Sequence, residues 1–84
     1  MSVAIESTYL DLYYMSVNEQ LGLRIKDLRI KGGLSQEAFA NKAQIDRTYI
    51  PSIEKGERNI SIAIIHKIAT ALGLSLSELF IGIN

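Results

Sequence analysis

A run of polar side chains around residue 47 carries the most distinctive chemistry of this sequence. Arg47 can donate two hydrogen bonds to guanine O6 and N7, and the methyl group of Thr48 can pack on a thymine methyl. The hydroxyl groups of Tyr49 and Ser52 are suited to phosphate oxygens. These residues predict contact with duplex DNA, through its bases by Arg47 and Thr48 and through its backbone by Tyr49 and Ser52. A solvated polar face without a ligand would have the same composition.

Three more polar residues flank this run. Gln36 falls in the first turn of an expected helix, where its amide and the helix N-terminus could both meet a phosphate. Arg58 and Asn59 follow Gly56 on an expected loop that could reach the DNA backbone. We therefore add Gln36, Arg58 and Asn59 as candidate backbone contacts.

The residues that enzymes and metal sites need are scarce. His66 is the only histidine, there is no cysteine, and the carboxylates do not cluster at acid/base or metal-ligand spacing. His66 lies within an apolar helical pattern and is expected to be a partly exposed helix residue. The sequence predicts no enzyme, no metal and no cofactor.

Five short helices are expected to position the polar residues. Leu21, Ile25 and Leu28 recur at helical spacing before a glycine pair at 32–33. The other helices are expected from Ser35 to about Lys42, from an Asp46 cap to Gly56, from Ser61 to Gly73, and from a capping box at Ser75 and Glu78. Helices this short must pack together to persist in water. The predicted fold is all-α, a five-helix orthogonal bundle.

A tight link joins the second and third expected helices around residues 43–45. Such a link forces a large crossing angle and leaves the outer face of the third helix free, with Ile50 and Ile53 inward. This is helix-turn-helix geometry, in which the second helix of the pair enters the major groove. Small Ala40 and Ala43 allow the two helices to approach closely.

Pro51 falls inside the expected recognition helix. With Asp46 as N-cap, Pro51 would be the fifth helical residue, and its missing N–H would remove a bond to the Arg47 carbonyl. A slight kink there could change how Arg47 and Thr48 meet the groove.

The charges balance. The sequence has nine Lys and Arg residues and nine Asp and Glu residues, a formal net charge of zero, which argues against a protein that binds any polyanion. Residues 18–59 hold eight basic and six acidic side chains, a mild local excess of positive charge. No stretch has the ~18 consecutive apolar residues of a membrane span, and no basic segment of a signal peptide opens the chain. The expected compartment is the cytoplasm.

The apolar C-terminal region predicts a homodimer. One recognition helix reads few base pairs, and two-fold dimers place two of them about 34 Å apart on a palindromic site. We expect an isologous interface through the fourth and fifth helices. The apolar side chains expected to exceed the capacity of a small core are Leu74, Leu76, Leu79, Phe80, Ile81 and Ile83, the first five of which are assigned to the interface. The alternative is that this segment folds back on its own core.

The sequence predicts a DNA-binding and dimerisation domain at 17–84, preceded by an extension of uncertain structure at 1–16. The extension carries Tyr9, Tyr13 and Tyr14, and the string Met-Ser-Val occurs at 1–3 and again at 15–17. Either the repeat is a coincidence or Met15 is an alternative translation start.

Several spaced strings resemble one known family. Leu-Ser-Gln-Glu-Ala-Phe-Ala at 34–40, Arg-Thr-Tyr-Ile at 47–50 and Ile-Glu-Lys-Gly-Glu-Arg-Asn-Ile-Ser at 53–61 are similar to the lambda-repressor-like (XRE/Cro) helix-turn-helix family. Within it, the Arg-Thr-Tyr-Ile and Gly-Glu-Arg-Asn segments are most similar to controller proteins of restriction–modification systems. The resemblance covers roughly residues 20–80 and implies a sequence-specific transcriptional regulator that binds a double-stranded DNA operator. The resemblance also implies the base contacts and the backbone contacts assigned above, and a structural ion pair between Arg29 and Glu54.

Two other readings stay open. An antitoxin-like or other protein-interaction module, or a phage-type repressor, would share these strings. RNA polymerase is a further candidate partner, through acidic residues such as Asp46 and Glu57, although nothing in the sequence singles them out.

Overall fold

Five α-helices make up the computed structural model over residues 15–84, the part of the chain that the structure describes. They are α2 (Val17–Lys31), α3 (Gln36–Ala43), α4 (Tyr49–Glu54), α5 (Ile62–Ala71) and α6 (Leu76–Leu79). Within residues 15–84 there is no strand, and the expected all-helical class is confirmed. The tyrosines and the first Met-Ser-Val string of the proposed extension lie outside the described residues.

Serine residues start four of these helices. The hydroxyls of Ser35, Ser61 and Ser75 accept hydrogen bonds from backbone N–H groups in the first turns of α3, α5 and α6, as expected. Ser16 and Glu19 form a capping box at the start of α2, which the sequence interpretation did not identify. Each cap satisfies a backbone donor that has no partner inside the helix.

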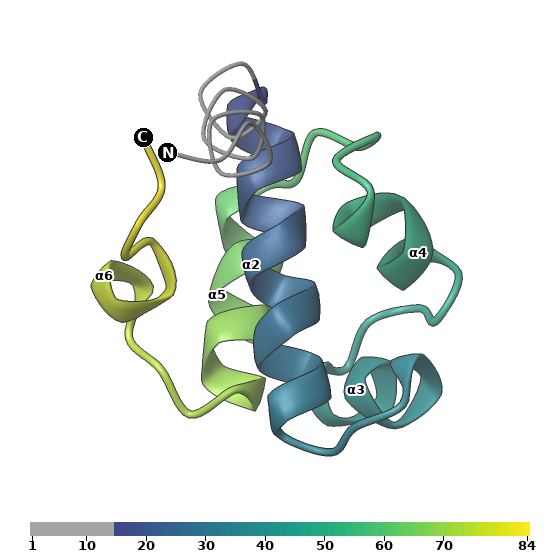
Figure 1. The fold of residues 1–84 in the computed structure, drawn as a ribbon. Coiled ribbons are helices and arrows are strands. Elements are labelled where there is room, and N and C mark those ends of the chain that lie inside the picture. The colour runs from purple at the N-terminus through teal and green to yellow at the C-terminus, as the bar shows by residue number, and fades with distance from the viewer. Residues whose placement is uncertain (1–14) are drawn as a thin grey trace, which may run out of the picture.

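The helices are arranged so that α3 and α4 lie on one side of α2 and α5, and α6 lies on the other (Figure 1). α4 packs on α2 at Gly22, where an added Cβ would lie 2.3 Å from the Ile53 carbonyl oxygen. Only a glycine permits this approach, because any larger side chain would meet backbone. The contact fixes α4 on the α2 scaffold.

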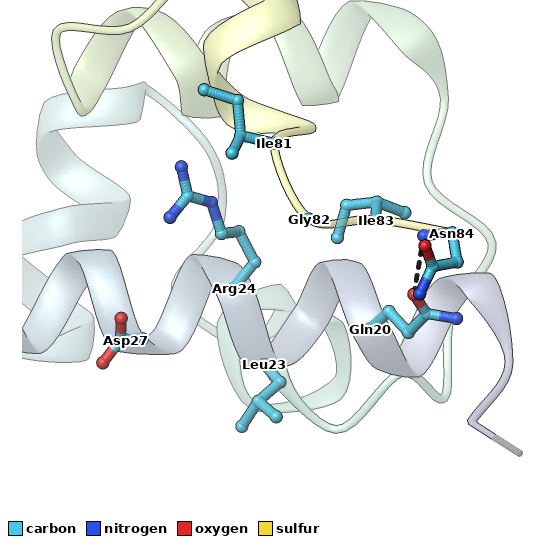
Figure 2. A pocket seen from close by; sticks show the side chains of 8 residues that line it. All are labelled: Gln20, Leu23, Arg24, Asp27, Ile81, Gly82, Ile83 and Asn84. Carbon is cyan, nitrogen blue, oxygen red and sulfur yellow. Dashed lines mark hydrogen bonds between the residues drawn. The ribbon is translucent and has the colours of Figure 1, made fainter. Parts of the chain in front are cut away.

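The C-terminal segment returns to α2. Arg24 donates hydrogen bonds to the carbonyls of Glu78 and Leu79 at 3.0 and 3.2 Å, and the Asn84 N–H donates to Gln20 Oε1 at 2.9 Å. A pocket lies between α2 and this segment, with the Gln20–Asn84 bond at one end (Figure 2). The C-terminus is thereby tied to the start of the domain.

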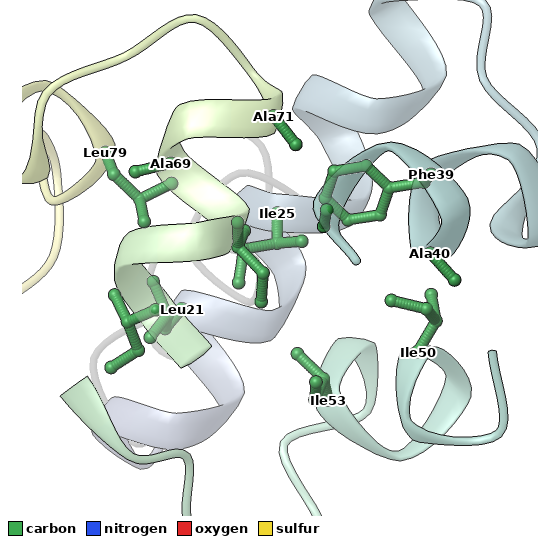
Figure 3. Close-up of a cluster of buried hydrophobic side chains, with 12 residues drawn as sticks. Leu21, Ile25, Phe39, Ala40, Ile50, Ile53, Ala69, Ala71 and Leu79 are labelled. Carbon is green, nitrogen blue, oxygen red and sulfur yellow. The ribbon is translucent and has the colours of Figure 1, made fainter. Parts of the chain in front are cut away.

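One apolar core joins the helices (Figure 3). Its largest fully buried side chains are Phe39, Ile25, Ile50, Ile53, Ile68 and Leu79. Burial of each such side chain contributes about 1.5–3 kcal/mol, so this cluster is a large contribution to holding the short helices together. In residues 15–84, none of the helices has the length and apolarity to cross a membrane.

Candidate nucleic-acid interface

α3 and α4 are joined by a turn that changes the direction of the chain. Gln44 ends α3 in the left-handed conformation, with φ of 58°, which few residues other than glycine adopt. The N–H groups of Gln44 and Ile45 donate to the carbonyls of Asn41 and Ala40 at 3.2 and 3.0 Å. These bonds satisfy acceptors at the end of α3. The expected helix-turn-helix unit is present.

The start of α4 corrects one expectation. Asp46 is not its N-cap: Asp46 Oδ1 accepts hydrogen bonds from the Thr48 N–H at 2.9 Å and the Thr48 hydroxyl at 2.7 Å, and the helix begins at Tyr49. Because Thr48 occupies the N-cap position of α4, the Asp46 side chain closes a turn just before the helix. The backbone bond, followed by the hydroxyl bond, lowers the pKa of Asp46 below its usual value.

Pro51 is better placed than the sequence suggested. Because α4 begins at Tyr49, Pro51 is in the first turn, where the N–H groups have no intrahelical acceptor. The Arg47 carbonyl accepts from the Ile50 N–H at 3.3 Å instead. The expected loss of a bond to Arg47 is therefore wrong, since the helix starts later than predicted.

The predicted base-contacting residues lie on the exposed edge of the turn and α4. Ile50 and Ile53 are 0% and 1% exposed and fill the core, whereas Arg47, Thr48 and Tyr49 are exposed. Within residues 15–84, no hydrogen bond or ion pair engages the Arg47 guanidinium. The Thr48 hydroxyl is bonded to Asp46, but its methyl group remains free for apolar contact. This edge therefore exposes guanidinium donors of the kind that can bond guanine in a major groove.

Three of the predicted backbone contacts form one cluster on the flank of α4. The Arg58 guanidinium carbon lies 4.4 Å from the centroid of the Tyr49 ring, and Arg58 Nε donates to Ser52 Oγ at 3.0 Å. Ser52 in turn donates to the Tyr49 carbonyl at 3.0 Å. The structure thus brings Tyr49, Ser52 and Arg58 together, a mutual arrangement that residue types alone did not indicate.

Gln36 and Asn59 are each held by a partner within the molecule. Gln36 Nε2 donates to Glu54 Oε1 at 3.2 Å, and Asn59 Oδ1 accepts from Asn18 Nδ2 at 2.8 Å. Each amide group still has an N–H to offer, because an amide carries two. Asn18 is a residue that sequence reasoning missed, since its link to Asn59 spans two distant segments.

Arg29 and Glu54 form a buried ion pair. Arg29 Nε lies 2.6 Å from Glu54 Oε2, Arg29 Nη2 donates to Oε1 at 3.0 Å, and the two side chains are 10% and 3% exposed. Arg29 Nη1 also donates to the Leu34 carbonyl at 2.8 Å. The hydrogen bond with Glu54 raises the pKa of Arg29 above its ordinary value, against the opposing effect of burial. The pair ties α2 to the end of α4, beside Gln36.

The predicted dimer surface needs one correction. Leu79 is 0% exposed and belongs to the protomer's own core, so it is not available to a partner. Leu74, Leu76 and Phe80 are half-buried against that core, because α6 packs on α5. Ile81 is 64% exposed. The segment therefore folds back on its own core and still leaves an apolar outer edge.

Other chemistry is sparse in the described part of the chain. Residues 15–84 contain no cluster of three His, Cys, Asp or Glu side chains that could hold a metal ion. His66 is exposed on α5, beside Lys67. The polar surface at α4 is thus the strongest candidate site among these residues.

The paired helices α3 and α4, with the outer edge of α4 exposed, define a helix-turn-helix domain. A family model described as Helix-turn-helix matches residues 25–79, and the chain belongs to this family. The resemblance found in the motif strings is confirmed.

Among sequences, the chain is similar to restriction–modification control proteins. It is 49% identical to the control protein C.MunI of Mycoplasma sp over 66 residues, which are 77% of this chain and 89% of the relative. It is 41% identical to C.BamHI of Bacillus amyloliquefaciens over 59 residues, which are 69% of this chain and 73% of the relative.

Solved structures agree. The controller protein C.AhdI of Aeromonas hydrophila has a TM-score of 0.71 and 42% identity, over 86% of this chain and 100% of that one. The C.Esp1396I tetramer in complex with its natural 35 base-pair operator has a TM-score of 0.73 and 33% identity, over 79% of this chain and 87% of that one. The chain is homologous to controller proteins of restriction–modification systems.

Proposed function

We propose that this protein is a sequence-specific DNA-binding transcriptional regulator, the controller protein of a restriction–modification system, and that it binds a palindromic operator as a dimer. The observation that carries the proposal is the exposed edge led by Arg47, held outward by the burial of Ile50 and Ile53. Homology to controller proteins, one of which is solved on its operator, supports the same conclusion.

The residues have distinct roles in this proposal. Arg47 reads a guanine edge and the Thr48 methyl packs on a thymine, which gives sequence specificity. Gln36, Asn59 and the cluster of Tyr49 and Arg58 face the phosphate backbone, which sets the register of α4 in the groove. The ion pair of Arg29 and Glu54 holds α4 in place from behind.

A binding titration with matched variants tests the role of Arg47. The probe is a labelled duplex from the region directly upstream of the protein's own gene, and a scrambled duplex serves as competitor. Arg47→Ala is expected to weaken specific binding by about 5- to 150-fold, the range for loss of one bidentate base contact. The control is Lys31→Ala, which removes one positive charge from the C-terminal end of α2. Lys31 is paired with Asp27, and its replacement is expected to change the affinity for the duplex little. Equal affinities of the two variants would contradict the proposal.

The proposed dimer uses the outer edge of the C-terminal segment. Ile81 is 64% exposed, so Ile81→Glu adds a charge to that edge without disturbing the core. Sedimentation equilibrium is expected to show a dimer for the unmodified protein and a monomer for Ile81→Glu at the same concentration. A monomer in both cases would contradict the dimer.

The proposal extends to contact with RNA polymerase and to a cytoplasmic location. Asp46 and Glu57 are both exposed and are candidates to touch polymerase. Activation as well as repression is expected in a promoter-reporter series over a range of protein levels. A monotonic decline of promoter activity would rule out activation.

A further inference from the structure

Arg58 is an exposed side chain that the protein holds in one place. Its guanidinium lies over the Tyr49 ring at 4.4 Å, well inside the ~6 Å limit of cation–π attraction, and its Nε donates to Ser52 Oγ at 3.0 Å. The stacking sets the plane of the guanidinium, and the hydrogen bond sets its rotation within that plane. Because Ser52 accepts only from Nε, the N–H donors on both terminal nitrogens of Arg58 are not used by this bond.

Ser52 has its single proton already in use. Its hydroxyl donates to the Tyr49 carbonyl at 3.0 Å, while a lone pair accepts from Arg58. A phosphate oxygen in DNA can only accept hydrogen bonds, so a serine can serve it only as a donor. Ser52 therefore cannot bond a phosphate while it keeps the bond to Tyr49.

We propose that Ser52 is a positioning residue that acts on DNA through Arg58. It links the α4 backbone to the Arg58 side chain and aims the terminal nitrogens of Arg58 at a DNA phosphate beside the recognition helix. An arginine that is already ordered loses less conformational freedom on binding, which improves affinity without an added contact. This inference rests on the proposed DNA-binding function and replaces the direct phosphate contact first expected of Ser52.

The first test needs no DNA. In the free protein labelled with ¹⁵N, the Nε–H signal of Arg58 is expected to be resolved and protected from exchange, and to lose that protection in Ser52→Ala. Ser52→Thr is expected to retain it, because a threonine hydroxyl in a helix can bond the same carbonyl. Thr70→Ala is the matched control, since the Thr70 hydroxyl also donates to a helix carbonyl, that of His66 at 2.9 Å, but holds no arginine. Loss of protection in Thr70→Ala, or its persistence in Ser52→Ala, would overturn the inference.

The second test is a double-mutant cycle on the upstream duplex. Arg58→Ala is expected to lower the salt dependence of binding by about 0.9 in log–log slope, the effect of one phosphate contact. Ser52→Ala is expected to weaken binding by about 2- to 10-fold, as for one net hydrogen bond, and to add nothing in the Arg58→Ala background. Additive losses would show that Ser52 contacts DNA itself and would overturn the inference. So would unchanged binding by Ser52→Ala when Arg58→Ala binds more weakly.

Failure of the function is distinguishable from failure of the inference. If Arg47→Ala and Arg58→Ala both bind the duplex as the unmodified protein does, the DNA-binding proposal fails, and the role assigned to Ser52 on DNA fails with it. Misfolding is not a confounding cause, because alanine is a better helix former than serine and Ser52→Ala should unfold at the same or higher urea concentration.

Discussion

Replacing Arg29 by methionine isolates the buried ion pair that ties α2 to α4. The variant keeps the apolar volume of the side chain but leaves the Glu54 carboxylate, whose side chain is 3% exposed, without its charged partner. Of the side-chain hydrogen bonds that this carboxylate now accepts, only the one from Gln36 at 3.2 Å would remain. Breaking a buried pair in this way costs about 3–5 kcal/mol.

That loss is large for a domain of this size. At about 0.05–0.15 kcal/mol per residue, a chain of 84 residues has a free energy of unfolding of about 4–13 kcal/mol. With a urea m value of about 1.5 kcal/mol/M, the midpoint is expected to fall by about 2–3 M. Far-UV circular dichroism is the assay, because the sequence has no tryptophan to follow by fluorescence.

Two controls make the result decisive. Lys31→Met breaks the pair of Lys31 with Asp27, whose side chains are 72% and 51% exposed, and is expected to cost less than about 1 kcal/mol. The double variant Arg29→Met with Glu54→Leu removes both buried charges and is expected to recover most of the lost stability. All variants are compared at one protein concentration, because a dimer's stability depends on it. A loss in Arg29→Met no larger than in Lys31→Met would refute the reasoning.

Three further changes test the packing and the turn that present α4. Gly22→Ala places a Cβ 2.3 Å from an α4 carbonyl oxygen and is expected to lower the free energy of unfolding, measured in urea, by about 1–3 kcal/mol. Gly32→Ala places its Cβ 3.4 Å from the nearest atom and is expected to cause no such loss. Pro51→Ala is expected to lower the free energy of unfolding by up to about 1 kcal/mol, because it raises the conformational entropy of the unfolded chain. An increase in the free energy of unfolding of about 3 kcal/mol would instead mean that Pro51 strains the helix. Asp46 is expected to titrate in NMR below the usual pKa of an aspartate, so the stabilisation from its ionised form is full above that usual pKa and is lost as the pH falls through the lowered pKa. Thr48→Val should raise this pKa part of the way, since the backbone bond remains; no change would mean that the hydroxyl bond is absent in solution.

Local signals in the sequence predicted most of the helices. Ser35, Ser61 and Ser75 are good N-caps that precede apolar patterns, and each starts a helix in the structure. The start of α4 was harder, because Asp46 and Thr48 are both cap-forming residue types. The turn geometry assigns Asp46 to bonding Thr48, and spacing alone does not encode that geometry.

Side-chain partners were predicted less well than backbone elements. In a helix as short as α6, an apolar run does not separate the inner face from the outer, so Leu79 was assigned to a dimer surface although it is 0% exposed. The bonds from Gln36 to Glu54 and from Asn18 to Asn59 join segments that only tertiary packing brings together. The residue types of the site could be predicted, but the partners that hold each side chain could not.

The formal charge of zero does not describe how charge is distributed around α4, and the local distribution decides what a DNA-binding surface can do. Arg29 and Glu54 neutralise each other inside the molecule, so neither contributes much to the field outside. In residues 15–84, neither Arg47 nor Arg58 has an acidic side chain as an ion-pair partner. An overall neutral protein has weak affinity for DNA of arbitrary sequence, since that affinity comes from phosphate neutralisation. A few well-placed cations on a neutral body therefore favour discrimination between operator and other DNA, and two-fold pairing of such edges would supply the affinity that each lacks alone.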